Sequence, residues 1–132
     1  MWWGKYIGIP FVDRGRNLGG LDCWGLVREV YARERGILLP SWTEHNGFDS
    51  LKNMFATEIH RFRKLDAPEP FAIAIISTSI TYLHVGVMVD TVNMLHSLAG
   101  RDSCLEPVAR FRYKLKGFYV PHDQDCCPPQ PP

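Results

Sequence analysis

Hydrophobic residues in the first half of the chain recur with the spacing of helices. Residues 23–35 predict one helix, with Asp22 as a good N-cap and Gly36 as its stop. The apolar stripe of this helix consists of Leu26, Val27, Val30 and Tyr31. Residues 50–62 show the same spacing and predict a second helix. Residues 1–21 are rich in glycine and turn formers, so we expect an ordered loop there.

Beyond a proline-containing break, the pattern changes from helical spacing toward alternation. Residues 71–77 form a near-continuous apolar run, which is typical of a buried strand. Residues 82–90 alternate, residues 92–98 return as the second strand of a hairpin, and residues 115–120 predict a last strand. The apolar side of the alternating strand consists of Leu83, Val85, Val87 and Val89. Helices first and strands afterwards indicate an α+β fold, with N-terminal helices packed on a central antiparallel sheet.

Length, charge and the two chain ends narrow the class of protein. The 132 residues suffice for one domain, which we place at residues 1–120, followed by a flexible Pro-rich tail at residues 121–132. The formal net charge of +1 is too small for a nucleic acid or an anionic membrane as partner. The first residues lack the pattern of a secretory signal, and no apolar run is long enough to span a bilayer. We therefore expect a protein made in the cytoplasm without a signal peptide.

The cysteines do not form a disulfide or zinc framework. Two of them, Cys126 and Cys127, are adjacent in the Pro-rich tail, and no Cys-x-x-Cys pair exists. Cys104 is interpreted as a small buried hydrophobic residue. We expect neither a metal nor another cofactor.

The remaining cysteine, Cys23, lies in the first turn of the first predicted helix, directly after a glycine-containing loop. Free backbone N–H groups and the positive end of the helix dipole favour a thiolate there and can bind an oxyanion. Gly19, Gly20 and Gly25 would let a substrate backbone approach closely. The alternative is a buried structural cysteine beneath a helix start, and position alone weighs the two about equally.

Two histidines lie where a base and its orienting partner are needed. His84 is on the alternating strand, on the face opposite the valines, and His96 follows on the return strand. If the two strands pair without a bulge, and the numbers of paired residues add up to an even number, the two histidines lie on the same face. The imidazoles then lie opposite or diagonal to each other, within hydrogen-bonding range. A cysteine nucleophile needs a base, and the base needs an orienting group. We therefore expect Cys23, His84 and His96 to be the catalytic residues.

Three runs surround these residues, in this order: Asp22-Cys23-Trp24-Gly25-Leu26-Val27, His84-Val85-Gly86-Val87 and Met94-Leu95-His96. Together they resemble the NlpC/P60 family of papain-like cysteine peptidases. That family carries an Asp-Cys-x-Gly-Leu-Val motif at a helix start, a His-x-Gly strand motif and a third polar residue, often His. The resemblance extends from about Tyr6 to Tyr119, which is nearly the whole chain.

The resemblance implies a papain-like fold, a substrate and a setting. The substrate would be a peptide stem of peptidoglycan, cut next to a D-amino acid such as D-glutamate. Trp24 after the cysteine, and the run from Gly8 to Arg16, resemble phage-tail and prophage members. This implies incorporation into a phage tail, beside other tail proteins. Members usually have a tyrosine that holds the substrate where this chain has Phe11.

A thiol at a helix start and a histidine on a strand can meet only where the helix packs across the sheet. We expect a groove there with little positive charge of its own. Its predicted substrate-binding residues are Phe11, Asp22, Trp24 and Tyr82, with Gly20 and Thr81 as further candidates for the lining.

Three other interpretations stay open. The chain could be a structural tail-tip protein with a vestigial site, although the intact set of cysteine and two histidines argues against it. It could be an amidase or acyltransferase of the same fold. Cys23, His84 and His96 could also be zinc ligands, but no motif places an acidic general base beside them.

Overall fold

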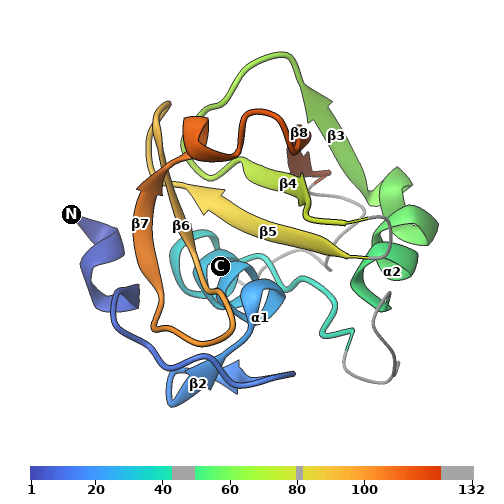
Figure 1. The fold of residues 1–132 in the computed structure, drawn as a ribbon. Helices are drawn as coiled ribbons and strands as arrows, with labels where there is room; N and C mark the ends of the chain where they lie inside the picture. The colour runs from blue at the N-terminus through green and yellow to red at the C-terminus, as the bar shows by residue number, and fades with distance from the viewer. Residues whose placement is uncertain (43–49, 80–81, 123–132) are drawn as a thin grey trace.

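The centre of the molecule is a six-stranded antiparallel sheet with the strand order β3-β8-β4-β5-β6-β7 (Figure 1). A computed structural model describes residues 1–42, 50–79 and 82–122; Thr81, Cys126 and Cys127 lie outside these ranges. The strands of the sheet are β3 (Phe62–Leu65), β4 (Ile73–Ser77), β5 (Leu83–Met88), β6 (Asn93–His96), β7 (Cys104–Pro107) and β8 (Leu115–Pro121). The short strands β1 (Arg16–Asn17) and β2 (Gly20–Leu21) form a separate pair. The predicted α+β class with an antiparallel sheet is confirmed.

The first helix begins and ends where the sequence predicts. Helix α1 (Cys23–Val30) continues into a π-helical turn (Tyr31–Arg35) and stops at Gly36, whose φ of 66° is left-handed. The side chain of Asp22 caps the helix by accepting a hydrogen bond from the N–H of Gly25. This cap fixes the start of α1 at Cys23.

The second helix is shorter than predicted, and two strands of the central sheet were missed, as was the short β1–β2 pair in the expected loop. Helix α2 (Ser50–Glu58) ends in a 3₁₀ turn (Ile59–Arg61), and the last predicted helical residue, Phe62, already belongs to β3. Strand β7 was not predicted either, because a four-residue strand carries too few alternating positions to stand out. Other 3₁₀ turns cover Trp2–Tyr6 and Val108–Phe111. At the C-terminal end, β8 includes Pro121, so the sheet reaches into the segment predicted as tail.

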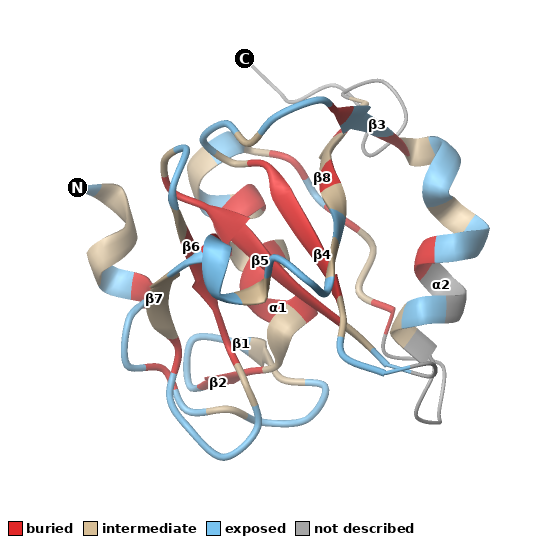
Figure 2. Cartoon of the chain, turned by 45° about the horizontal axis from the view of Figure 1, so that its top comes forward, coloured by how far each residue is buried: buried red, intermediate tan, exposed pale blue. Residues whose placement is uncertain are grey.

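Both faces of the central strands are buried (Figure 2). On one face, Val85 and Val87 of β5 pack with the apolar stripe of α1 in the main core. On the other face, Met88 and Met94 join a smaller cluster that Phe111 helps to cover. The sequence predicted that the first face is buried. The second face is buried because the 3₁₀ turn at Val108–Phe111 packs against it. Within the described residues, no helix is long and apolar enough to cross a membrane.

Candidate active site

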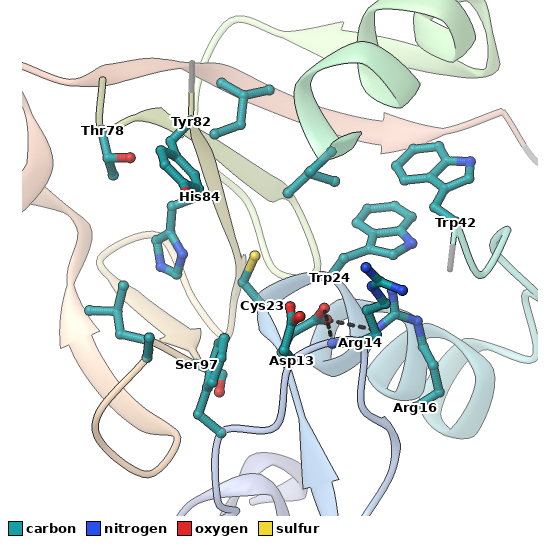
Figure 3. A pocket seen from close by; sticks show the side chains of 16 residues that line it. Asp13, Arg14, Arg16, Cys23, Trp24, Trp42, Thr78, Tyr82, His84 and Ser97 are labelled. Carbon is teal, nitrogen blue, oxygen red and sulfur yellow. Dashed lines mark hydrogen bonds and ion pairs between the residues drawn. The ribbon is translucent and has the colours of Figure 1, made fainter. Parts of the chain in front are cut away.

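Cys23 lies at the first residue of α1, in the wall of a cavity of about 590 Å³ (Figure 3). The carboxylate of Asp22 organises the backbone around it. Its Oδ1 accepts hydrogen bonds from the N–H of Gly25 and from the guanidinium of Arg16, both at 2.7 Å. Its Oδ2 accepts from the N–H of Arg14 at 3.0 Å. Asp22 therefore ties the preceding loop to the helix start that carries the thiol.

The glycines near Cys23 make room for the protein's own loop. A Cβ atom added at Gly25 would lie 2.1 Å from the carbonyl oxygen of Gly15, and one at Gly20 would lie 2.2 Å from the side chain of Val12. The expectation that these two glycines admit a substrate backbone is therefore wrong. Their small size allows tight packing between the loop and α1.

The two predicted histidines meet on neighbouring strands. His96 of β6 pairs with Gly86 of β5, so His84 lies diagonal to His96 on the same face. His84 Nε2 lies 2.8 Å from His96 Nδ1. The predicted diagonal arrangement within hydrogen-bonding range is confirmed. His84 lines the cavity, whereas His96 lies behind it with 1% of its surface exposed.

Pairing between β5 and β6 begins at Gly86, so the preceding residues of β5 have no partner in β6 as described. One of these residues, Val85, makes a backbone hydrogen bond to the thiol of Cys23. Figure 3 shows Cys23 and His84 projecting into the same cavity from α1 and β5. The fold thus brings together the thiol and the imidazole that the sequence proposed as nucleophile and base.

Glu106 is a functional candidate that sequence reasoning missed. Its Oε1 lies 2.8 Å from Nε2 of His96, across the β6–β7 pair. Two arginines hold the same carboxylate: Arg101 at Oε1, and Arg110 at Oε2 at 3.2 Å. Nothing in the sequence marks Glu106 as special, because its contact with His96 depends on the register of a strand that was not predicted.

Cys104 also lies beside His96. Its Sγ is 3.6 Å from His96 Nε2 and 3.5 Å from Glu106 Oε1, and the residue is half-buried. The interpretation of Cys104 as a mere buried hydrophobic residue is therefore wrong. It belongs to the polar surroundings of the third predicted catalytic residue.

Burial dominates the titration of the thiol and the imidazole. It raises the pKa of Cys23 to about 12, and the charge of Asp22 acts in the same direction, against backbone hydrogen bonds from Val85 and Trp24. Burial lowers the pKa of His84 to about 3, with a further contribution from His96. The expectation that the helix start alone favours a thiolate is not met, because desolvation outweighs the helix dipole here. Both shifts favour a neutral thiol and a neutral imidazole in the resting pair.

All four predicted substrate-binding residues line the cavity: Phe11, Asp22, Trp24 and Tyr82. Trp24 forms a wall rather than a mobile contact, because its ring is 2% exposed and stacks on Trp42 with a centroid distance of 4.2 Å. The indole N–H of Trp24 donates to the carbonyl of Pro40. Gly20 is not part of the lining.

The cavity is more charged than predicted. Asp13, Arg14 and Arg16 contribute to its lining, together with Asp22. Arg16 is paired with Asp22, whereas Arg14 and Asp13 are exposed residues of the lining (Figure 3). The groove therefore contains more positive charge than expected, although the two aspartates balance the two arginines. The sequence signal was the charged run from Asp13 to Arg16, directly before the cysteine motif.

One group of side chains has a spacing that could hold a metal ion. His96, Cys104 and Glu106 each offer one ligand atom, and these atoms lie within 4.8 Å of one another. The two arginines on Glu106 disfavour a divalent cation there, since they already neutralise the carboxylate. Cys23 and His84 do not belong to any such group among the residues that the structure describes.

Comparison with known proteins extends these observations. A model of the NlpC/P60 family matches residues 8–114, while a search of curated protein sequences finds no match. Among solved structures, the chain is similar to the NlpC/p60 domain of the peptidoglycan hydrolase SagA. The identity is 23%, the similarity covers 89% of this chain and 91% of that domain, and the TM-score is 0.60.

Two further structures show the same fold. One is an NlpC/P60 family protein from Bacillus cereus ATCC 10987, with 18% identity, 86% of this chain and 35% of that chain covered, and a TM-score of 0.64. The other, from Staphylococcus aureus subsp. aureus Mu50, is described as similar to lipoprotein, NLP/P60 family. Its identity is 20%, the similarity covers 89% of this chain and 38% of that chain, and the TM-score is 0.63. The chain thus spans little more than a third of these two proteins. With a family match over most of its length and a shared fold, the chain belongs to the NlpC/P60 family.

Proposed function

We propose that this chain is a cysteine endopeptidase that cleaves amide bonds in the peptide stems of peptidoglycan. The observation that carries the proposal is that Cys23 and His84 line one cavity, with His96 behind His84 at a distance of 2.8 Å between the two imidazoles. Family membership supports the reaction class, and the SagA neighbour, named as a peptidoglycan hydrolase, supports the substrate.

The neutral resting pair defines the first chemical step. When a substrate carbonyl lies against Cys23, His84 Nδ1 takes the thiol proton while Sγ attacks the carbonyl carbon. The resulting oxyanion is stabilised by N–H groups at the start of α1 other than that of Gly25, which donates to Asp22. The imidazolium of His84 then gives its proton to the leaving amine, and a thioester remains on Cys23. Water, deprotonated by His84, hydrolyses the thioester and restores the thiol.

The lining of the cavity supports a short peptide as substrate. Phe11, Trp24 and Tyr82 supply apolar walls, and Asp13 and Arg14 supply charges of both signs at the rim. A stem peptide offers both an amino group and carboxylates to such a rim. A polyanion would be repelled by the aspartates and held by few arginines.

We further propose that the peptidase acts as a component of a phage or prophage tail, where it would thin the cell wall during entry. Trp24 and the run from Gly8 to Arg16 support this setting, since they resemble tail-associated members. Tail proteins would then be partners of the chain.

The decisive experiment incubates the purified protein with muropeptides and identifies the products by mass. We expect fragments cut within the stem, and no such fragments with Cys23→Ala. A matched control replaces the two tail thiols, Cys126 and Cys127, with alanine and should cleave like the wild type. Cleavage of glycan strands alone would contradict the proposal. Absence of cleavage by a protein whose Cys23 reacts with iodoacetamide would favour an amidase, an acyltransferase or a structural tail protein.

A further inference from the structure

A line of three polar side chains runs from the cavity across the sheet. Its members come from the neighbouring strands β5, β6 and β7, which lie side by side in Figure 1. His84 Nε2 and His96 Nδ1 are 2.8 Å apart, and His96 Nε2 and Glu106 Oε1 are also 2.8 Å apart. His96 pairs with Gly86, and Glu106 pairs with Met94, so each member lies diagonal to the next.

The far end of this line determines where the protons lie. Burial opposes ionisation of Glu106, but hydrogen bonds from His96 and Cys104 and the contact with Arg101 together lower its pKa to about 2. A carboxylate can only accept hydrogen bonds, so His96 Nε2 must donate to it. Burial lowers the pKa of His96, whose Nδ1 therefore keeps a lone pair.

The same logic continues to the cavity. Because His96 Nδ1 accepts, His84 Nε2 must be the donor of their shared hydrogen bond. Since His84 is neutral, its lone pair lies on Nδ1. This is the nitrogen that must be unprotonated for His84 to take the proton of Cys23.

The carboxylate at the end of the line is itself held firmly. Arg110 and Arg101 contact its two oxygens, and Cys104 lies within 3.5 Å of Oε1. The side chain of Glu106 is 13% exposed and that of His96 is fully buried. Arg101 lowers the pKa of His84 and the carboxylate of Glu106 raises it, so removal of the carboxylate charge would leave the arginine unopposed.

We propose that Glu106 is a positioning residue of the active site, which acts through His96 to hold His84 in the tautomer with a free Nδ1. It also stabilises the imidazolium that forms when the proton moves from Cys23 Sγ to His84 Nδ1, since the Nε2–H of His84 stays bonded to His96 throughout. This inference rests on the proposed peptidase function for its catalytic meaning.

The test compares Glu106→Gln, which keeps the size and removes the charge, with Glu106→Asp, which keeps the charge. Glu34→Gln is a matched control, because the side chain of Glu34 is similarly buried with 14% exposed, is paired with Lys5 and does not line the cavity. Three readouts are recorded at about pH 7. They are the ring ¹⁵N–¹H resonances of the histidines, the rate of Cys23 alkylation by iodoacetamide, and kcat and KM on muropeptides.

We expect the wild type to show protons on Nε2 of both His84 and His96. Glu106→Gln should shift the Nε2–H resonance of His96, slow the alkylation of Cys23 and lower kcat roughly 10- to 100-fold at an unchanged KM. Glu106→Asp should restore part of each loss. Glu34→Gln should match the wild type in all three readouts.

A proton on Nδ1 of His84 in the wild type would overturn the proposal. So would a folded Glu106→Gln protein with wild-type resonances and rates, or one whose rates fall only in proportion to its unfolded fraction. The resonances and the alkylation rate need no substrate. A wild type that cleaves no muropeptide but responds to Glu106→Gln in these two readouts would refute the proposed substrate and retain the positioning role.

Discussion

At the scale of single residues, the cavity combines a protonated thiol with an unprotonated imidazole. A stable ion pair between Cys23 and His84 would lower the pKa of the thiol and raise that of the imidazole, because an opposite charge favours the ionised form of each group. Burial prevails instead, raising the pKa of the thiol and lowering that of the imidazole. Both shifts therefore oppose ionisation of the pair in the protein without substrate.

The raised pKa of Cys23 predicts the pH dependence of thiol alkylation. The rate of iodoacetamide modification at Cys23, resolved by peptide mapping, should keep rising from about pH 7 to about pH 10. His84→Gln should lower the rate at about pH 7, because the base that assists deprotonation is lost. A rate that is already constant below about pH 7 would show a preformed thiolate–imidazolium pair and contradict the neutral resting state.

Phe11 gives a second prediction at this scale. Because its ring lines the cavity, Phe11→Tyr adds a hydroxyl that can contact the substrate. We expect KM for stem peptides to change by about 2- to 10-fold, the value of one hydrogen bond, without an effect on Cys23 alkylation. Phe71→Tyr is a matched control, since Phe71 stacks on Trp2 away from the cavity. An equal effect of both substitutions would remove Phe11 from the binding site.

At the scale of elements, the β5–β6 hairpin sets the distance between the two imidazoles. Gly86 stands opposite His96, and a Cβ there would lie 2.4 Å from Met94 and 3.0 Å from the carbonyl oxygen of Leu95. Both neighbours are fully buried, so neither can move freely. The glycine therefore allows β6 to approach β5 closely enough for His84 and His96 to meet.

Gly86→Ala tests this dependence. We expect a loss of roughly 1–3 kcal/mol in the free energy of unfolding, typical of overpacking, and a loss of activity in the protein that stays folded. Urea denaturation and turnover measure the two effects. Gly4→Ala is the control, because its new Cβ would meet only the end of the Met1 side chain at 3.5 Å. A Gly86→Ala protein of wild-type stability would mean that the hairpin tolerates the wider spacing.

At the scale of the whole molecule, the line of polar side chains is enclosed by two apolar clusters. The main core lies between α1 and the sheet, and the smaller cluster lies on the other face, where Phe111 contacts both His84 and His96. Burying a neutral imidazole links folding to pH. The unfolded chain binds a proton at the ordinary pKa of 6.5, whereas the folded chain resists protonation of His84 down to about pH 3.

Stability should therefore be complete above about pH 6.5 and should fall as the pH decreases toward 3. From His84 alone, we expect a loss of about 2 kcal/mol in the free energy of unfolding between about pH 8 and pH 5. Glu106, with its lowered pKa, adds to the loss below about pH 4.5. Urea titrations across this range measure how the free energy of unfolding depends on pH. His84→Gln should weaken this dependence, whereas His60→Gln, at an exposed imidazole, should leave it unchanged. A flat profile in the wild type would mean that His84 is charged or solvated in the folded protein.

The sequence by itself determined the elements whose signals are local. The cap at Asp22 and the stop at Gly36 fixed the ends of the first helix, and the alternating hairpin placed His84 and His96 on one face. These features depend on backbone hydrogen bonding and side-chain periodicity within short segments, so nearby residues specify them. The family resemblance rested on the same segments, and the family match confirms it.

Only the tertiary structure decided what surrounds these residues. The sheet order brings β7 beside β6, and this places Glu106 against His96 although no local pattern distinguishes that carboxylate. The depth of burial raises the pKa of Cys23, whereas the helix start had led us to expect a lowered pKa. Desolvation depends on every atom packed around a group, and these atoms come from distant parts of the chain. A helix start can be recognised from the few residues around it, but the protonation state of the thiol it carries follows from the whole fold.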